Sequence, residues 1–175
     1  MTAAASLEAF IRNVPDFPKP GILFKDITPL LRSHEALTQA CALLAEPFRQ
    51  QGITHVAGIE SRGFIFGSIV AANLGAGFVP IRKPGKLPWT TRRHEYTLEY
   101  GSDALEMHDD ALAPGDRVLV IDDVLATGGT LAAATHLVRG FDAALAGAAV
   151  VIELSFLGGR EKLGAGVNVH SVLRY

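Results

Sequence analysis

Two adjacent carboxylates, Asp122 and Asp123, stand a few residues before a glycine pair that is flanked by threonines, in residues 126–130. Threonine hydroxyls and the free amides of a glycine-rich turn can donate hydrogen bonds to an anion. Carboxylates can accept hydrogen bonds from the vicinal hydroxyls of a sugar. Together these residue types predict a site for a ribose that carries a phosphate.

The elements around this segment would place it at one edge of a sheet. Residues 118–121 form an uninterrupted apolar run, which is typical of a strand buried on both faces of a parallel sheet. Residues 131–139 contain strong helix formers and are followed by Gly140. Open α/β sheets bind ligands where strands end and helices begin, and the helix dipole favours an anion there. Taken alone, a glycine-rich turn could also be a tight βα turn with a capping aspartate.

A second strand, polar loop and helix follow the same order at residues 55–75. Arg62 would stand in that polar loop, where its forked guanidinium suits phosphate oxygens, although a surface ion pair is the alternative. The basic run at residues 82–93 could coat a solvated face. Its prolines, its glycine and Trp89 instead favour a mobile excursion that folds over a polyanionic ligand.

The rest of the chain alternates predicted helices and strands, which indicates a mostly parallel α/β sheet. We expect a first helix with Leu7 and Val14 on one face that ends before Pro15, and then a rigid, packed loop with an extended piece around Leu23 and Phe24. The remaining expectations are a helix capped by Ser33 with the apolar stripe Leu37, Ala40, Cys41, Leu44 and Phe48, a strand at 77–81, a hairpin at 95–108 with its turn at 101–103, a strand at 146–154, a polar turn at 158–163 and an edge strand at 167–173.

Composition limits the class of protein. The chain has 175 residues with 49% hydrophobic and 19% charged residues, which predicts one folded domain with a sizeable core. Its net charge of −2 argues against capture of nucleic acid or an acidic membrane. The single cysteine, Cys41, is expected to be an inert core thiol in a reducing compartment. No export signal is visible, so we expect a cytoplasmic protein.

Six segments carry a resemblance to a known family. They are residues 16–27 (DFPKPGILFKDI), 60–64 (ESRGF), 82–88 (RKPGKLP), 96–101 (YTLEYG), 120–130 (VIDDVLATGGT) and 159–163 (GREKL). Along nearly its whole length the chain resembles an adenine phosphoribosyltransferase. Residues 120–130 mark only the wider superfamily, whereas residues 16–27 and the LEYG turn point to adenine. Glu60 departs from the aspartate that many members have there.

The resemblance implies a single-domain type I phosphoribosyltransferase fold over residues 1–175. Residues 1–33 would form an adenine-binding hood, and residues 82–108 a mobile loop with a flexible β-hairpin. In the implied roles, Asp122 and Asp123 bind the ribose hydroxyls, and the 5′-phosphate is bound by Ala126, Thr127, Gly128, Gly129 and Thr130. Pyrophosphate is bound by Ser61 and Arg62, with Lys83 and Lys86 reaching over from the loop or a neighbouring subunit. Adenine is bound by Leu23, Phe24 and Lys25, and the reacting centre is closed over by Glu99 and Tyr100. It also implies a homodimer.

The residue types fit the implied reaction. Breaking a bond from ribose to pyrophosphate leaves positive charge on the sugar and negative charge on the leaving group, so carboxylates and cations are needed at opposite ends. Mg²⁺ would bridge substrate oxygens, and we expect no direct protein ligand for it. Either Glu99 or Asp123 would take the surplus proton of the base. Glu99 could also be a solvated hairpin charge, and Phe24 plain core rather than a stacking platform.

Three other functions remain open from the sequence. The same fold could serve hypoxanthine, guanine or xanthine. A non-catalytic nucleotide-sensing regulator would use the fold to control nucleic acid, although the chain has neither a helix-turn-helix segment nor a net basic charge. A phospho-acceptor signalling domain would leave the glycine loop unexplained. From the resemblance, the expected partners are adenine and 5-phosphoribosyl 1-pyrophosphate. We expect neither nucleic acid nor a membrane as a partner.

Overall fold

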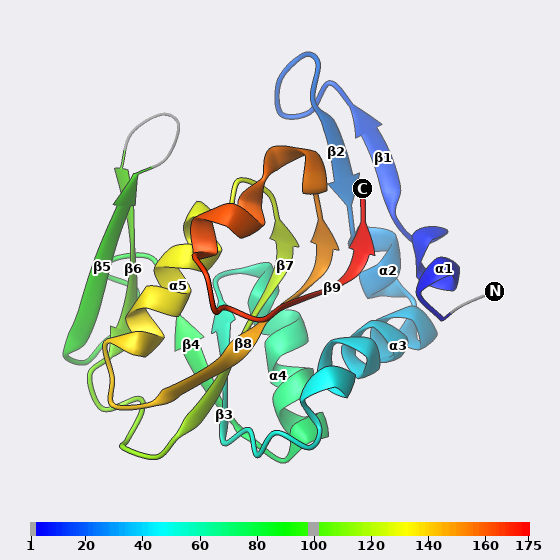
Figure 1. The fold of residues 1–175 in the computed structure, drawn as a ribbon. Coiled ribbons are helices and arrows are strands. Elements are labelled where there is room, and N and C mark those ends of the chain that lie inside the picture. Colours follow the sequence, from blue (N-terminus) through cyan, green and yellow to red (C-terminus); the bar gives the residue numbers. More distant parts are fainter. Residues whose placement is uncertain (1–2, 98–101) are drawn as a thin grey trace.

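Five parallel strands form the central sheet of the computed structural model, which describes residues 3–97 and 102–175 (Figure 1). The strands are β3 (His55–Ile59), β4 (Gly77–Ile81), β7 (Arg117–Leu125), β8 (Ala144–Glu153) and β9 (Val169–Arg174), and their order across the sheet is β4-β3-β7-β8-β9. The predicted α/β class with a mostly parallel sheet is confirmed, and β7 is the middle strand.

Helices cover both faces of this sheet (Figure 1). They are α1 (Ala3–Glu8), α2 (Thr28–Arg32), α3 (His34–Ala45), α4 (Arg62–Leu74) and α5 (Gly129–Arg139). Alternate residues of β7 point to opposite faces. Leu119 and Ile121 pack in the core with α3 and α4, whereas Val118 and Val120 pack in a second core with α5. This double burial explains the uninterrupted apolar run in the sequence.

The predicted ends of two helices are confirmed. The Ser33 side chain accepts a hydrogen bond from the Ala36 amide at 3.2 Å, so it caps α3. The helix α4 ends at Gly75, whose φ of +66° is the left-handed conformation that glycine adopts most easily. Cys41 is fully buried on α3, and burial raises the pKa of its thiol to about 12. It is the inert core thiol that the sequence predicted.

The N-terminal helix is shorter than predicted. It ends at Glu8, and β1 (Arg12–Pro15) pairs antiparallel with β2 (Leu23–Asp26). Val14 therefore lies opposite Phe24 in a hairpin instead of on a helix face. A few apolar residues at helical spacing are weak evidence, and strand pairing outweighs them. The extended piece around Leu23 is confirmed, but the expected packing of the loop is wrong, because residues 15–22 are all exposed.

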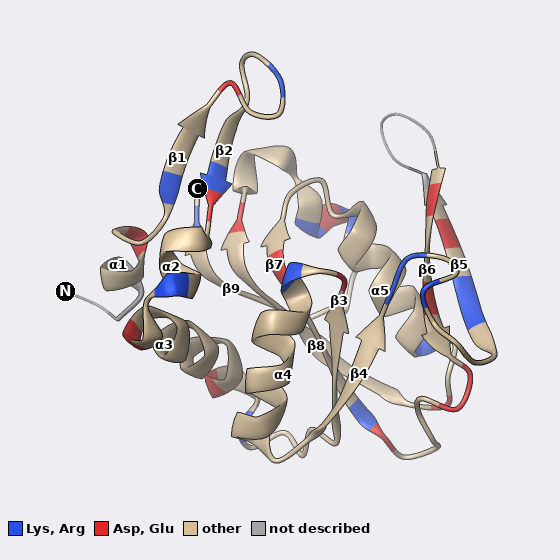
Figure 2. Cartoon of the chain, turned by 180° about the vertical axis from the view of Figure 1, so that it is seen from behind, with Lys and Arg blue, Asp and Glu red and all other residues tan. Residues whose placement is uncertain are grey.

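The second predicted hairpin is present. It consists of β5 (Thr91–Thr97) and β6 (Ser102–His108), joined through residues 98–101, which lie outside the described residues. The predicted residues Glu99 and Tyr100 lie there. Both strands extend further than expected, so Arg92 and Arg93 of the basic run belong to β5 and are not loop residues. Figure 2 shows the basic segment after β4 lying beside β5 and β6.

The connections near the C-terminus contain short 3₁₀ helices. Residues 158–163, predicted as a polar turn, contain η3 (Gly159–Leu163), which follows η2 (Ser155–Leu157). A further 3₁₀ helix, η1 (Glu46–Phe48), lies elsewhere in the chain and extends α3. The edge position of β9 is confirmed. Within the described ranges, no helix has both the length and the apolar character needed to cross a membrane.

Candidate active site

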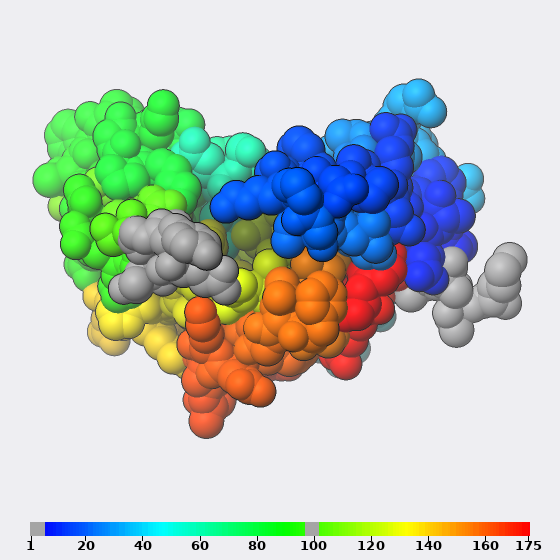
Figure 3. All heavy atoms as spheres, turned by 90° about the horizontal axis from the view of Figure 1, so that it is seen from above, coloured from blue at the N-terminus to red at the C-terminus, as the bar shows by residue number. Residues whose placement is uncertain are grey.

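A cavity of about 480 Å³ opens at the carboxyl ends of β3 and β7, and its inner wall includes the glycine-rich loop after β7. The space-filling view shows the hollow between the N-terminal segment, in blue, and the β5–β6 hairpin region, in green (Figure 3). Its lining residues are Ile22, Leu23, Phe24, Lys25, Glu60, Ser61, Arg62, Lys83, Leu154 and residues 122–131. The two strand-loop-helix segments thus meet at one sheet edge, as the sequence predicted.

The acidic pair lies inside β7 and not after its end, because the strand continues to Leu125 beside β8. Asp122 and Asp123 are 9% and 6% exposed. Burial, and then the negative charge of Asp123, raise the pKa of Asp122 well above its usual value. Space is also tight here, since a Cβ atom at Gly63 would lie 2.8 Å from the Ile121 carbonyl oxygen. The buried pair therefore favours ligands that bring hydrogen-bond donors or positive charge.

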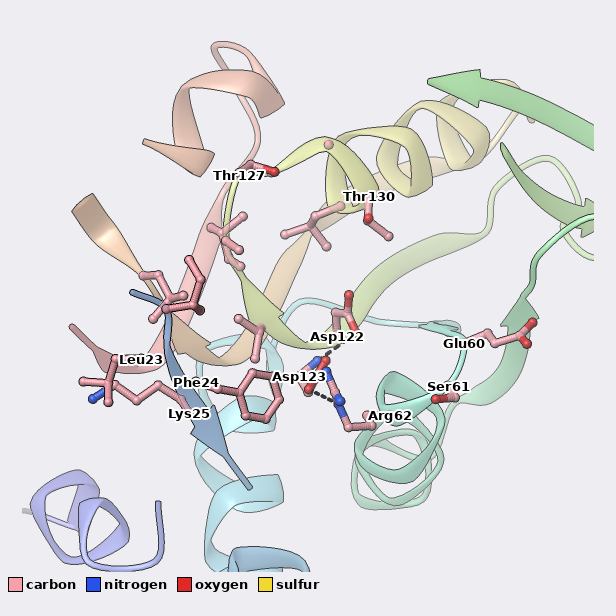
Figure 4. Close-up of a pocket in the computed structure, with 18 of the residues that line it drawn as sticks. Leu23, Phe24, Lys25, Glu60, Ser61, Arg62, Asp122, Asp123, Thr127 and Thr130 are labelled. Atoms are coloured by element: carbon pink, nitrogen blue, oxygen red, sulfur yellow. Dashed lines mark hydrogen bonds and ion pairs between the residues drawn. The ribbon is translucent and has the colours of Figure 1, made fainter. Parts of the chain in front are cut away.

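Arg62 connects the two segments. It is the first residue of α4, and its Nε donates a hydrogen bond to Asp123 Oδ2 (Figure 4). The Arg62 side chain is 48% exposed, whereas the Asp123 side chain is 8% exposed. The guanidinium thus faces the cavity with donors to spare for an anion, because it carries five N–H groups. Arg62 therefore lies at the sheet edge where it was expected, although in the first turn of α4 and not in the preceding loop. In the free protein it pairs with a carboxylate, as the alternative interpretation had it, but that carboxylate is buried and not on the surface.

The glycine-rich loop forms a turn that only glycine fits. Gly128 has a φ of +82°, and a Cβ atom there would lie 2.2 Å from the Gly159 carbonyl oxygen. The helix α5 begins at Gly129, two residues earlier than predicted, so its first N–H groups belong to the loop. Thr130 Oγ1 lies 3.4 Å from the Tyr96 hydroxyl. Amides, a hydroxyl and the positive end of a helix therefore face the cavity together.

The three predicted adenine-binding residues lie on two faces of β2. Phe24 points toward Asp123 and Arg62, while Leu23 and Lys25 lie on the opposite side of the strand (Figure 4). The Lys25 ammonium donates to Asn13 Oδ1 at 2.8 Å and lies 3.7 Å from the centre of the Tyr175 ring. The aromatic ring of Phe24 is thus the side chain of this trio that can stack on a ligand in the cavity.

Of the two predicted loop lysines, one lines the cavity. Lys83 donates hydrogen bonds to the Asp103 carboxylate and, at 3.1 Å, to the Tyr96 hydroxyl. Lys86 is not among the lining residues, and its carbonyl accepts a hydrogen bond from Arg82 at 3.0 Å. Ser61 lines the cavity as expected.

Sequence reasoning did not assign roles to Tyr96 and Asp103, although both hold Lys83. They lie opposite each other in the β5–β6 register. The alternation of the predicted hairpin could have paired them, because directly opposed residues share one face. A turn placed at residues 101–103 hid this pairing, since Asp103 then belonged to the turn.

The sequence and the fold match known proteins. The sequence profile of the phosphoribosyl transferase domain matches residues 28–162. The adenine phosphoribosyltransferase of Nitrosococcus oceani is 56% identical over 169 residues, which cover 97% of this chain and 98% of that protein. The chain belongs to the adenine phosphoribosyltransferase family. Membership in this family makes it a phosphoribosyltransferase, and it confirms the resemblance drawn from the six segments.

Solved structures of the family agree. The adenine phosphoribosyltransferase of Rhodothermus marinus superposes with a TM-score of 0.93 at 55% identity, covering 99% of this chain and 98% of that chain. The enzyme of Saccharomyces cerevisiae, in complex with D-2,5-dideoxy-2,5-imino-altritol 1,6-bisphosphate and adenine, gives a TM-score of 0.92 at 40% identity and 98% coverage of each chain. The type I phosphoribosyltransferase fold of the present chain is therefore confirmed.

Proposed function

We propose that the chain transfers the 5-phosphoribosyl group of 5-phosphoribosyl 1-pyrophosphate to adenine, giving AMP and pyrophosphate in purine salvage. The observation that carries this proposal is the composition of one cavity wall. A buried acidic pair, an amide-rich loop at a helix N-terminus and the aromatic ring of Phe24 all line the same cavity. These groups match a sugar, its phosphate and a flat base. The names of the family's closely similar members support adenine as the base.

The sugar phosphate would bind across the start of α5. Its phosphate would accept hydrogen bonds from the amides of residues 127–130 and from the threonine hydroxyls. Its ribose hydroxyls would donate to Asp122 and Asp123, which lie in β7 just before that loop. Donation by hydroxyls compensates the cost of keeping these carboxylates out of water.

The pyrophosphate would bind two cationic side chains that form ion pairs with carboxylates in the free protein. Arg62 is bound to Asp123, and Lys83 is bound to Asp103. A pyrophosphate carries more charge than either carboxylate and can accept from both cations at once. Its arrival would free Asp123 for the ribose. Ser61 and Lys86 complete the proposed pyrophosphate site, with Lys86 supplied by a loop movement or by the partner of a homodimer.

In the reaction, a bond forms between adenine N9 and ribose C1 while the bond from C1 to the pyrophosphate oxygen breaks. The electron pair of the broken bond leaves with pyrophosphate, where Arg62 and Lys83 stabilise its charge. Asp122 and Asp123 stabilise the positive charge that develops on the ribose. The surplus proton of adenine goes to Glu99 or to Asp123. Residues 1–33 are proposed to cover adenine, and residues 82–108, with Tyr100, to close over the reacting centre.

A magnesium ion fits the donor set of this cavity. Mg²⁺ prefers oxygen ligands and usually keeps several waters, with substrate phosphates supplying much of its coordination. The described residues contain no cluster of three or more histidine, cysteine or acidic side chains that could hold a metal by themselves. Asp122 and Asp123 would accept from the ion's waters and from the same ribose hydroxyls. When bound, the ion would neutralise charge on the leaving pyrophosphate.

The test is to incubate the protein with Mg²⁺, 5-phosphoribosyl 1-pyrophosphate and each purine base in turn, and to follow pyrophosphate release and nucleotide formation. We expect AMP from adenine and at least tenfold slower turnover with hypoxanthine, guanine or xanthine. Equal use of guanine would overturn the choice of adenine. Binding of 5-phosphoribosyl 1-pyrophosphate without turnover of any base would favour the nucleotide-sensing regulator. Omission of Mg²⁺ in the presence of a chelator is expected to stop the reaction.

A further inference from the structure

An ion pair between a buried carboxylate and a partly exposed arginine joins the end of β8 to η3, outside the cavity wall. Glu153, the last residue of β8, is 5% exposed. Arg160 donates to both of its carboxylate oxygens, from Nε at 2.6 Å and from Nη2 at 2.7 Å. Neither residue lines the cavity. Arg160 belongs to the GREKL segment, residues 159–163, to which the proposed reaction gives no role.

Arg160 makes two further hydrogen bonds from its guanidinium. Its Nη1 donates to the Val169 carbonyl at 2.8 Å, and its Nη2 donates to Ser171 Oγ at 3.0 Å. The hydrogen bond from Arg160 is the main cause of the lowered pKa of Glu153, so that carboxylate is ionised at neutral pH. This planar fork fixes Arg160 against both β8 and β9, which a lysine could not reproduce.

Arg160 is adjacent to the glycine that touches the phosphate-binding loop. A Cβ atom at Gly159 would lie 2.2 Å from the Ala126 carbonyl oxygen and 3.0 Å from the Gly128 nitrogen. A Cβ atom at Gly128 would lie 2.2 Å from the Gly159 carbonyl oxygen. The two backbones therefore pack directly against each other. In addition, Glu153 is the register partner of Leu125, the residue from which the loop departs.

We propose that Arg160 and Glu153 are positioning residues for phosphate binding, because they hold the Gly159 backbone as the outer wall of residues 126–128. Through this contact, the ion pair sets where the loop amides point. The inference rests on the proposed function, in which residues 126–130 bind the 5′-phosphate. A displacement of about 1 Å in such a site can cost about 100-fold in rate.

The test compares two Arg160 variants with a matched control. Arg160→Gln and Arg160→Lys both lose the fork, while Arg174→Gln removes another partner of Glu153, 3.3 Å away in β9, without touching η3. For each variant we would measure the dissociation constant of ribose 5-phosphate by calorimetry, and the KM values for 5-phosphoribosyl 1-pyrophosphate and for adenine. Thermal melting followed by circular dichroism checks that each variant is folded.

The expected result is a split between the two substrates. Both Arg160 variants should weaken ribose 5-phosphate binding and raise the KM for 5-phosphoribosyl 1-pyrophosphate by about tenfold or more, with the KM for adenine within about twofold of wild type. Arg174→Gln should change neither. Ser171→Ala removes the acceptor of one Arg160 N–H and the hydroxyl that donates to Glu153 Oε2 at 2.6 Å, so it should give a smaller shift in the same direction. It keeps the test decisive if an Arg160 variant does not fold.

Two results would overturn the proposal. One is unchanged ribose 5-phosphate binding in the folded Arg160 variants, or in Ser171→Ala if those do not fold. The other is an equal loss for adenine and for the sugar phosphate, which is the mark of general destabilisation. Calorimetry with ribose 5-phosphate needs no turnover, so a wild-type protein that binds it but makes no AMP would contradict the proposed function while leaving this inference standing.

Discussion

At the scale of single residues, the site depends on charges that are placed before substrate arrives. Asp123 is bound by Arg62, and Asp122 is buried beside it. Preorganised charges of this kind need little rearrangement when charge develops in the reaction. In the free protein, however, Arg62 and Lys83 are each paired with a carboxylate, so the pyrophosphate has to replace these carboxylates when it binds. Variants that remove one charge without changing shape test this account directly.

The first such variant is Asp123→Asn. The amide has nearly the shape of the carboxylate, so we expect a folded protein, but it leaves Arg62 without its ion-pair partner and weakens acceptance from ribose hydroxyls. Turnover of adenine should fall by about 100-fold or more. Initial rates at saturating substrates, with circular dichroism as the folding control, measure this effect. A variant that turns over at the wild-type rate would remove Asp123 from the ribose site.

The second variant is Glu99→Gln, which separates the two candidates for the general base. If Glu99 takes the proton of adenine, the rate constant kcat should fall by about 100-fold while the KM for adenine changes little. The conservative comparison is Glu95→Gln, an exposed hairpin carboxylate that forms an ion pair with Arg93 at 2.9 Å. An unchanged kcat in Glu99→Gln would assign the proton to Asp123.

At the scale of elements, the tightest feature is the crossing of two backbones at Gly128 and Gly159. Gly128→Ala would place a Cβ atom 2.2 Å from a carbonyl oxygen at a residue with a φ of +82°. Because the neighbour is backbone, the loop itself must move. We expect ribose 5-phosphate affinity to fall at least tenfold, measured by calorimetry. Gly115→Ala, also at positive φ but with open space around it, is the control and should bind normally.

The elements that the sequence predicted well are those with a strong local signal. The apolar run of β7 is long enough to mark a strand buried on both faces, and Gly75 and Gly140 mark helix ends. The β1–β2 hairpin carries no such signal, because its pairing joins two short, incompletely buried segments across a proline-rich loop. The sequence also did not predict that Lys83 donates hydrogen bonds to Tyr96 and Asp103, for a related reason. This contact depends on a hairpin register, which a misplaced turn conceals.

At the scale of the whole molecule, the β5–β6 hairpin packs against α5, next to the cavity. The rings of His94 in β5 and His136 in α5 stack with their centres 3.9 Å apart. Burial, and then the charge of His136, lower the pKa of His94 below its ordinary value of 6.5. The unfolded chain therefore binds a proton more readily than the folded protein does. The part of the free energy of unfolding that this pKa difference contributes is fully present above pH 6.5. It is lost as the pH falls through the lowered pKa of His94.

We accordingly expect the free energy of unfolding to fall as the pH is lowered from 7 through 6.5 and below. His94→Gln should make this fall smaller but not abolish it, because burial also lowers the pKa of His170. Urea unfolding at a series of pH values gives the measurement, with His34→Gln on an exposed site as the control. If His94→Gln has the same pH dependence as wild type, His94 is not a source of that dependence.

The central claim is that a sugar phosphate binds where β7 passes into α5. The most direct test is a crystal structure of the protein with AMP. We predict the phosphate oxygens within hydrogen-bond distance of the amides of residues 127–130, the ribose hydroxyls on Asp122 and Asp123, and the adenine ring against Phe24. An AMP molecule bound elsewhere, with this cavity empty, would contradict the account.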